Sequence, residues 1–288
     1  KTAYEISLVL VGSEMCIRDS NKILKPKSKI LIIAGSDSSG GAGIQADIKT
    51  VTALGSYAMT AITAVTSQNT TGLKSIVAIP SREISKQIEF TSKDIKPHAI
   101  KIGMLHSAEV INAVLKSLNK INVKKIILDP VMVAKGGDRL LRKDAVNVIQ
   151  DELYPLAMIV TPNVPEAEIL AQMEIRSNSH MRRAAEIIVD KGANSIVLKG
   201  GHLSGDAVDL FYDGNAFIEF VRPRVNTRNS HGTGCTFSSA IAVGLGKGFK
   251  LEESIEMAKE YVTKALLSAK SVGLGQGPLE HFFAFDIQ

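Results

Sequence analysis

The segment Asn229–Thr236 carries the clearest chemistry in this sequence. It reads Asn-Ser-His-Gly-Thr-Gly-Cys-Thr and is followed by the small and apolar residues 237–245. Small residues allow backbone amides to converge, and a helix that begins here presents its positive end to whatever lies above it. That arrangement suits a phosphoryl group or a developing oxyanion. A tight structural loop is an equal alternative at this point.

Cys235 lies in the same turn. The start of a helix lowers the pKa of a thiol and favours the thiolate, which would make Cys235 reactive. The alternative is a small hydrophobic side chain that packs in the interior. A single Gly-x-Gly pattern does not separate these two interpretations.

A second glycine-rich segment, residues 34–47, joins a predicted strand to a predicted helix. From Gly41 to Ala46 it matches the pattern Gly-x-Gly-x-x-Ala of dinucleotide-binding enzymes. No Asp or Glu lies between Asp47 and Glu83, so the carboxylate that would bind a ribose is missing. The spacing therefore argues against an NAD-dependent oxidoreductase.

Two other common sites are excluded by pattern. No Gly-x-x-x-x-Gly-Lys-Ser/Thr motif occurs, so a nucleotide would be held in another way. The six histidines show no His-x-x-x-His spacing, and the cysteines are only Cys16 and Cys235. This excludes a disulfide scaffold, argues against a zinc site and favours the reducing cytoplasm.

Predicted strands and helices alternate along the chain, and these elements must position the residues named above. Short runs rich in Ile and Val predict buried parallel strands at residues 30–34, 99–105, 125–128, 158–160 and 195–198. Helices are predicted at residues 43–54, 107–118, 181–191 and 254–272. Such alternation is typical of a parallel sheet with helices on both faces.

Two pairs of segments break the alternation. Residues 208–212 and 216–221 flank Asp213-Gly214, which predicts a β-hairpin with a type I′ turn. Residues 59–67 and 75–79 predict two more strands, at an edge of the sheet. Polar and glycine-rich residues collect after the parallel strands, so we expect one ligand-binding mouth at their carboxyl ends.

Composition sets the class of protein. The chain has 288 residues, a net charge of +5, 45% hydrophobic residues and 22% charged residues, which are globular values. No apolar run reaches the roughly 20 residues of a membrane span. The charges are interspersed, and the lysines within residues 22–29 are interpreted as a solvated edge rather than a nucleic-acid site. We expect neither nucleic acid nor membrane as a partner.

Residues 1–20 do not fit the rest of the sequence. They begin with Lys, and the apolar stretch at residues 6–11 is short for a signal peptide. We expect this segment to be non-native or artefactual. Residues 21–288 are then expected to form a single domain.

The motifs together resemble the hydroxymethylpyrimidine/phosphomethylpyrimidine kinases of thiamine biosynthesis, over residues 29–283. The shared motifs, in family order, are the string of residues 34–47, Thr66-Ser-Gln-Asn-Thr70, Lys101-Ile-Gly-Met104, Asp129-Pro-Val-Met132, Ala134-Lys-Gly-Gly137, Thr161-Pro-Asn163, Pro165-Glu166, Lys199-Gly-Gly-His202 and His231-Gly-Thr-Gly-Cys235.

The resemblance implies the ribokinase-like fold, an α/β three-layer sandwich with a central, mostly parallel sheet and a small β edge or lid. It implies transfer of the γ-phosphoryl group of ATP, with Mg²⁺, to 4-amino-5-hydroxymethyl-2-methylpyrimidine and then to its monophosphate. A cytoplasmic enzyme is expected, and a homodimer is compatible with the family.

The resemblance also assigns residues. The pyrimidine is expected to contact Gln68, Gly35, Asp47, Met104 and Val131. Phosphates and Mg²⁺ are expected near Lys199, Asn163, Glu166 and Asp129. The anion hole is expected to comprise Gly232, Thr233 and Gly234, with Cys235 as the base. A carboxamide offers the donor and the acceptor that an aminopyrimidine edge needs, and carboxylates suit hydrated Mg²⁺.

Two rivals are considered besides the oxidoreductase. A pyridoxal kinase has the same fold and a similar substrate, but dual-activity relatives carry a second cysteine where this chain has Ala134. A pyrimidine-binding regulator without catalysis would be expected to have lost the motif at residues 232–235, which is intact here.

Overall fold

A single sheet organises the computed structural model, which describes residues 26–133, 140–142, 144–203 and 205–285. The strand order is β3-β2-β1-β4-β5-β6-β7-β8-β9. The strands are β1 Lys29–Asp37, β2 Tyr57–Asn69, β3 Gly72–Ala78, β4 Ala99–Ile102, β5 Ile126–Leu128, β6 Ile159–Val160, β7 Ile196–Lys199, β8 Ala207–Tyr212 and β9 Phe217–Arg222. The pairings from β2 to β7 are parallel, and β3, β8 and β9 pair antiparallel at the two edges.

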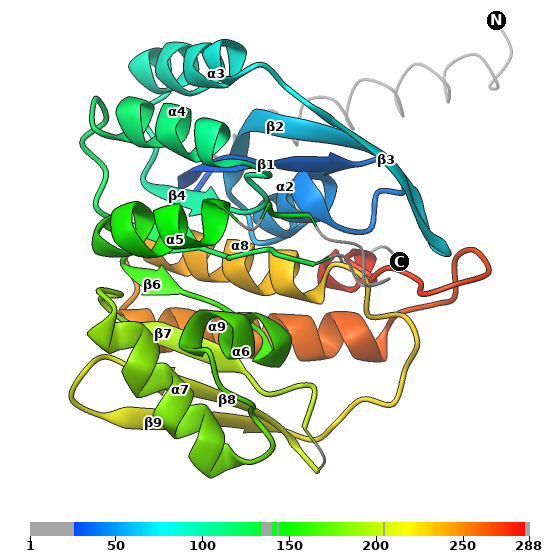
Figure 1. The fold of residues 1–288 in the computed structure, drawn as a ribbon. Helices are drawn as coiled ribbons and strands as arrows, with labels where there is room; N and C mark the ends of the chain where they lie inside the picture. Colours follow the sequence, from blue (N-terminus) through cyan, green and yellow to red (C-terminus); the bar gives the residue numbers. More distant parts are fainter. Residues whose placement is uncertain (1–25, 134–139, 143, 204, 286–288) are drawn as a thin grey trace, which may run out of the picture.

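Helices cover both faces of this sheet (Figure 1). One layer contains α3 Ser81–Asp94, α4 Ala108–Leu118, α5 Ala145–Val148, α6 Val164–Ala171 and α7 Asn178–Asp190. The other layer contains α2 Gly43–Ala53, α8 Thr233–Lys247 and α9 Leu251–Leu267. The predicted three-layer α/β architecture is confirmed.

Alternation along β1 explains the two-sided core. Leu31 and Ile33 belong to the cluster under α3, α4, α6 and α7, whereas Ile30 and Ile32 belong to the cluster under α2, α8 and α9. All four side chains are fully buried. A parallel strand covered on both faces has no solvent side, and its sequence therefore reads as a continuous apolar run.

All five predicted parallel strands are present, with two corrections to element length. The run at residues 99–105 forms a strand only over Ala99–Ile102, after which the chain leaves the sheet toward α4. The last predicted helix starts earlier, at Leu251, and ends at Leu267 rather than at Val272. The sequence pattern predicts neither α3 nor α6. In α3 only Ile84 and Ile88 are buried apolar side chains, and α6 has only eight residues.

The predicted type I′ turn is wrong. The predicted hairpin is present, but Tyr212 pairs with Phe217, so the loop between β8 and β9 has four residues, 213–216, whereas a type I′ hairpin loop has two. Of these only Gly214 has a positive φ, whereas a type I′ turn needs two such residues. The Asp213 carboxylate accepts hydrogen bonds from the amides of Asn215 and Ala216, which stabilises the longer loop.

The edge strands β2 and β3 confirm the predicted ribbon at one side of the sheet. β2 has 13 residues and runs past the end of β1, which has 9. Its far end is held by the loop after α9, because the amides of Gly275 and Gln276 donate to the hydroxyl and the carbonyl of Thr70. This contact fixes the strand end that carries Gln68.

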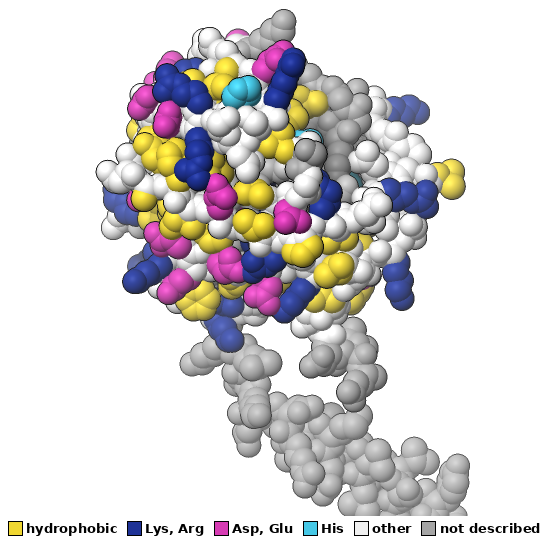
Figure 2. Space-filling model, turned by 90° about the horizontal axis from the view of Figure 1, so that it is seen from below, with side chains coloured by type: hydrophobic (Ala, Val, Ile, Leu, Met, Phe, Trp, Pro, Cys, Tyr) yellow, Lys and Arg dark blue, Asp and Glu magenta, His cyan; other side chains and the backbone are white. Residues whose placement is uncertain are grey.

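Positive and negative side chains are mixed on the surface that Figure 2 shows. On the face in Figure 2, Lys and Arg side chains are interspersed with Asp and Glu. In the described part of the chain, no helix is both long enough and apolar enough to span a bilayer.

Candidate active site

A cavity of about 720 Å³ lies beyond the carboxyl ends of the parallel strands. It confirms the single mouth expected from the sequence. The predicted site residues that line it are Gly35, Gln68, Met104, Asp129, Val131, Asn163, Glu166, Lys199, Gly232, Thr233, Gly234 and Cys235. Asp47 is the exception among the predicted residues.

The start of α8 faces this cavity, and two glycine-rich loops are interlocked around it. Gly232 is the N-cap with φ 86°, in the left-handed region that favours glycine. A Cβ at Gly232 would lie in steric overlap with the carbonyl of Gly41. The hydroxyl of Thr233 donates to the carbonyl of Ser230 at 2.7 Å. The first turn of the helix therefore lies against the loop before α2.

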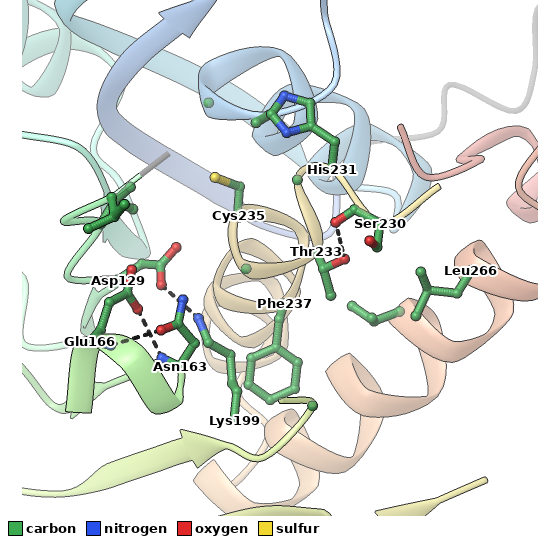
Figure 3. Close-up of a pocket in the computed structure, with 18 of the residues that line it drawn as sticks. Asp129, Asn163, Glu166, Lys199, Ser230, His231, Thr233, Cys235, Phe237 and Leu266 are labelled. Carbon is green, nitrogen blue, oxygen red and sulfur yellow. Dashed lines mark hydrogen bonds and ion pairs between the residues drawn. The ribbon is translucent and has the colours of Figure 1, made fainter. Parts of the chain in front are cut away.

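Cys235 sits in this turn with a half-buried thiol that lines the cavity (Figure 3). Burial raises its pKa to about 12, and the carboxylates of Asp47 and Asp129 act in the same direction. The ammonium of Lys101 and the amide of Gly43 oppose the rise without cancelling it. Of the two interpretations that the sequence left open, the raised pKa therefore favours the neutral thiol over the thiolate.

Asp129 and Lys199 form a buried ion pair at the floor of the cavity, with Nζ 3.0 Å from Oδ1. The hydroxyl of Thr161 also donates to Oδ1, at 3.1 Å. Burial opposes the ionisation of Asp129, but Lys199 and Lys101 hold its pKa below the ordinary value. The strand ends β5, β6 and β7 thereby place a fixed carboxylate and a fixed cation side by side.

Asn163 and Glu166 form a capping box at the start of α6. The side chain of Asn163 accepts from the amide of Glu166, and the Glu166 carboxylate accepts from the amide of Asn163, both at 2.9 Å. Burial raises the pKa of Glu166 to about 7, and Asp129 adds to the rise while Lys199 opposes it. The Asn-x-x-Glu element is therefore also a structural cap.

Asp47 lies behind the cavity wall rather than in it. It is fully buried on α2, and its carboxylate accepts from Nζ of Lys101 at 2.8 and 2.9 Å and from Ser239 of α8 at 2.8 Å. Burial opposes the charge of Lys101, yet Asp47, Cys235 and Asp129 raise its pKa above the ordinary value. The sequence analysis quoted Lys101 within a motif and gave it no role, although its side chain lines the cavity.

Gln68 lies at the opposite end of the cavity, on β2. Its carboxamide is 3.2 Å from Nε2 of His231, which in turn is 2.8 Å from a carboxylate oxygen of Asp37. His231 precedes Cys235 by four residues, so Gln68 and the start of α8 share one site. The sequence analysis missed Asp37 and His231, although both stand inside the glycine-rich segments it selected.

Comparison with known proteins identifies the family. The family model described as phosphomethylpyrimidine kinase matches residues 37–280. A hydroxymethylpyrimidine/phosphomethylpyrimidine kinase of Rhizobium meliloti is 46% identical over 256 residues, which cover 88% of this chain and 96% of the relative. The chain belongs to the phosphomethylpyrimidine kinase family.

Two further comparisons place this family member. A bifunctional thiamine biosynthesis protein of Geobacter sulfurreducens is 46% identical over 276 residues, which cover 96% of this chain but only 56% of that protein. The structure of pyridoxal kinase from Staphylococcus aureus in complex with AMP-PCP and pyridoxal superposes with a TM-score of 0.83 at 34% identity, covering 91% of this chain and 96% of that one. The ribokinase-like fold is therefore shared with both kinds of kinase.

The site of this phosphomethylpyrimidine kinase family member has a third region, which could not be predicted from the sequence. Beside Lys199, an apolar slot is lined by Phe237 of α8 and by Val262 and Leu266 of α9 (Figure 3). A buried ion pair between Asp209 and Lys259, at 2.7 Å, lies at the same side of the cavity. In the sequence these residues belong to no motif, and their residue types are ordinary for a helix or a strand.

Proposed function

We propose that this chain transfers the γ-phosphoryl group of ATP to 4-amino-5-hydroxymethyl-2-methylpyrimidine and then to the resulting monophosphate. The observation that carries the proposal is one cavity with Gln68 at one end and the Asp129–Lys199 pair at the other, with the start of α8 between them. A kinase of this kind needs the alcohol, the anion hole and the phosphates within one enclosed volume.

Each end of the cavity suits one part of that reaction. The carboxamide of Gln68 offers a donor and an acceptor to the aminopyrimidine edge, with Gly35, Met104 and Val131 around the ring. The apolar slot at Phe237 and Leu266 suits a nucleotide base, and Lys199 would carry positive charge toward the phosphates. Because phosphoryl transfer passes through a loose transition state, this positioning and charge supply most of the catalysis.

The proposed Mg²⁺ position fits the residues present. Asp129 and Glu166 are both buried, and their proximity raises the pKa of Glu166, so a divalent cation would relieve the repulsion between them. No group of three or more His, Cys, Asp or Glu side chains that could form a full metal cage occurs in the described ranges. Mg²⁺ keeps water and shares phosphate oxygens, so Asp129 and Glu166 would suffice to hold it. When bound, the ion would neutralise charge on the phosphates.

Pyridoxal is the second candidate substrate, favoured by the similarity to the Staphylococcus aureus enzyme. Identity to the pyrimidine kinase of Rhizobium meliloti is higher, at 46% against 34%. Ala134, the position where dual-activity relatives carry a second cysteine, lies outside the described residues. We therefore propose the pyrimidine as the main substrate, and pyridoxal as at most a side substrate.

An ADP-release assay tests the proposal. Hydroxymethylpyrimidine, its monophosphate, pyridoxal, hydroxyethylthiazole and ribose are compared at equal concentration with MgATP. We expect ADP release with the first two and little with the others. Lys199→Met, which removes the cation of the buried pair, serves as the low-activity control. Ribose or pyridoxal as the best substrate would contradict the proposal, and so would binding of the pyrimidine without ADP release.

Three proposals of the sequence analysis stand beside this function. The cysteine content supports a cytoplasmic location. The family resemblance supports a homodimer. A single domain over residues 21–288 is supported by the one sheet that runs through the described ranges.

A further inference from the structure

The carboxylate of Asp37, at the end of β1, is saturated with hydrogen-bond donors. One oxygen accepts from the amide and the hydroxyl of Ser39, and the other from the amide of Ala42 and from Nε2 of His231, all at 2.8 Å. Burial opposes ionisation, yet the bonds from His231 and Ser39 lower the pKa of Asp37 to about 2. Asp37 is therefore a carboxylate, which can only accept.

Because Asp37 can only accept, Nε2 of His231 must carry a hydrogen and donate it. This holds whether the ring is neutral or charged, since Nε2 is protonated in both cases. The ring is held in place because it packs over Gly41, where an added Cβ would lie 2.5 Å from Cδ2 of His231. The amide of His231 also donates to the carbonyl of Gly277 at 3.0 Å.

The protonated Nε2 dictates the orientation of the Gln68 carboxamide. One terminal atom of that amide lies 3.2 Å from Nε2 of His231, and the other lies 3.4 Å from the hydroxyl oxygen of Thr66. The Thr66 hydroxyl has one hydrogen, and we assign it to the carbonyl of Ser36, which lies closer, at 3.0 Å, and can only accept. A protonated Nε2 has one hydrogen, which it donates to Asp37, and no free lone pair, so it cannot accept a hydrogen from an amide N–H of Gln68. The threonine oxygen offers a lone pair. Since amide oxygen and nitrogen are assigned from their neighbours, the oxygen belongs beside His231 and the nitrogen beside Thr66.

We propose that Asp37 and His231 position the carboxamide of Gln68 in this one orientation, and that they thereby select a ring edge on which an amino donor stands next to a ring-nitrogen acceptor. The inference rests on the proposed function, because it takes Gln68 as the group that contacts the pyrimidine. Each amide atom keeps one bonding position for the cavity, the oxygen as acceptor and the nitrogen as donor. Asp37 and His231 act through Gln68 and are positioning residues.

The discriminating ligand is the 4-oxo analogue of the proposed substrate, 4-oxo-5-hydroxymethyl-2-methylpyrimidine. It has the same shape, but an oxo acceptor replaces the amino group and a ring N–H replaces the acceptor nitrogen. Against a fixed amide this places oxygen against oxygen and N–H against N–H. An amide that is free to turn by 180° would match either edge.

The experiment compares kcat/KM for the amino and the oxo compound in the wild type, Asp37→Asn, His231→Phe and Ser39→Ala. We expect the wild type to prefer the amino compound by about 10³-fold or more, as sites built around a hydrogen-bonded edge do. Asp37→Asn lets Nε2 accept, and His231→Phe removes the nitrogen. Both should reduce the preference at least about tenfold, with the loss carried mostly by KM for the pyrimidine. Ser39→Ala, which perturbs the same loop but leaves the contact to His231, should keep the preference.

Two results would overturn the inference. The first is an undiminished preference in variants whose circular dichroism and nucleotide affinity match the wild type. The second is an unprotonated Nε2 of His231 in the free wild-type enzyme, read from ¹⁵N imidazole shifts. A wild type inactive on both pyrimidines would count against the proposed function, and the ¹⁵N tautomer then decides the positioning of Gln68 separately.

Discussion

Two opposing effects act on the pKa of the Cys235 thiol. The start of α8 favours a negative charge, while desolvation of the half-buried thiol, with Asp47 and Asp129 nearby, raises its pKa to about 12. The thiolate is therefore a minor form at neutral pH, and its fraction rises tenfold with each pH unit below the pKa. Any role of Cys235 as a base must depend on that minor form, since the thiol itself cannot accept the substrate proton.

Replacing Cys235 by Ala tests this role. We expect turnover to fall by about 10²–10⁴-fold, the usual contribution of a general base, while nucleotide affinity stays unchanged. Wild-type turnover should also rise with pH between about 7 and 9, because the thiolate fraction grows there, and the rise should be absent in Cys235→Ala. Initial rates across pH and calorimetric titration of the nucleotide provide both measurements. Equal turnover in the two proteins would remove Cys235 from the chemistry.

Some residues of the site can be predicted from the sequence, and others cannot. Gln68 and Cys235 could be chosen because each stands in a short motif whose chemistry matches one part of the reaction. Lys101, Asp37 and His231 also stand in motifs, but their roles depend on partners far away in the chain. Nothing local indicates that Asp37 contacts a residue 194 positions later.

At the scale of elements, the site depends on the contact between the loop before α2 and the start of α8. Gly232 has φ 86°, and a Cβ there would lie in steric overlap with the carbonyl of Gly41. Gly248, at the other end of α8, has a similar φ of 94°, but no atom lies within 4 Å of its added Cβ. The two glycines therefore separate the cost of backbone strain from the cost of lost loop contact.

We predict different outcomes for Gly232→Ala and Gly248→Ala. Both should lose about 1–2 kcal/mol of unfolding free energy, because a side chain disfavours the left-handed conformation. Only Gly232→Ala should lose more stability than this and at least about 100-fold in turnover, since its Cβ separates the loops around the proposed anion hole. Urea unfolding and the ADP-release assay measure both effects. Comparable turnover in the two variants would show that the contact at Gly41 is unimportant.

The buried pair Lys101–Asp47 ties β4 to α2 and, through Ser239, to α8. Lys101→Met leaves a buried carboxylate without its cation, so we predict a loss of about 3–5 kcal/mol in unfolding free energy. Adding Asp47→Asn should recover a large part of that loss, because the amide oxygen still accepts from Ser239 and no buried charge remains. Denaturant unfolding of the single and double variants measures the recovery.

A surface pair supplies the matched control. Lys120 and Glu89 are also 2.8 Å apart, but their side chains are 62% and 37% exposed. Lys120→Met should therefore cost less than about 1 kcal/mol. If Lys101→Met cost no more than Lys120→Met, the buried pair would not link the three elements.

For the whole molecule, the sequence predicts the layers and the position of the mouth better than the details. The Ile- and Val-rich run at residues 30–34 predicts β1 because a strand buried on both faces needs apolar residues at every position. The same argument cannot find α3, whose polar sequence is held by few buried contacts. It also cannot place Asp47, since a carboxylate on an amphipathic helix gives no sign that Lys101 of β4 will bury it.

At the scale of the whole molecule, the buried residue His281 predicts how stability depends on pH. His281 is buried, and its Nδ1 lies 3.0 Å from the hydroxyl of Tyr261 on α9. Burial lowers the pKa of His281 to about 4, and the cation of Lys49 adds to this while Glu280 opposes it. The imidazole is therefore neutral in the folded protein and forms a hydrogen bond with the tyrosine hydroxyl. In the unfolded chain it binds a proton near its ordinary pKa of 6.5.

Stability should therefore decrease as the pH falls from about 6.5 to 4, because the unfolded state takes up a proton that the folded state refuses. At about 1.4 kcal/mol per pKa unit, His281 should contribute a loss of about 3 kcal/mol at pH 4 relative to pH 7. His281→Asn keeps a hydrogen-bonding group beside Tyr261 and cannot titrate. The difference in unfolding free energy between the wild type and His281→Asn should therefore change by about 3 kcal/mol between pH 7 and pH 4. Parallel pH profiles for the wild type and His281→Asn would mean that the buried, neutral imidazole is absent from the folded protein in solution.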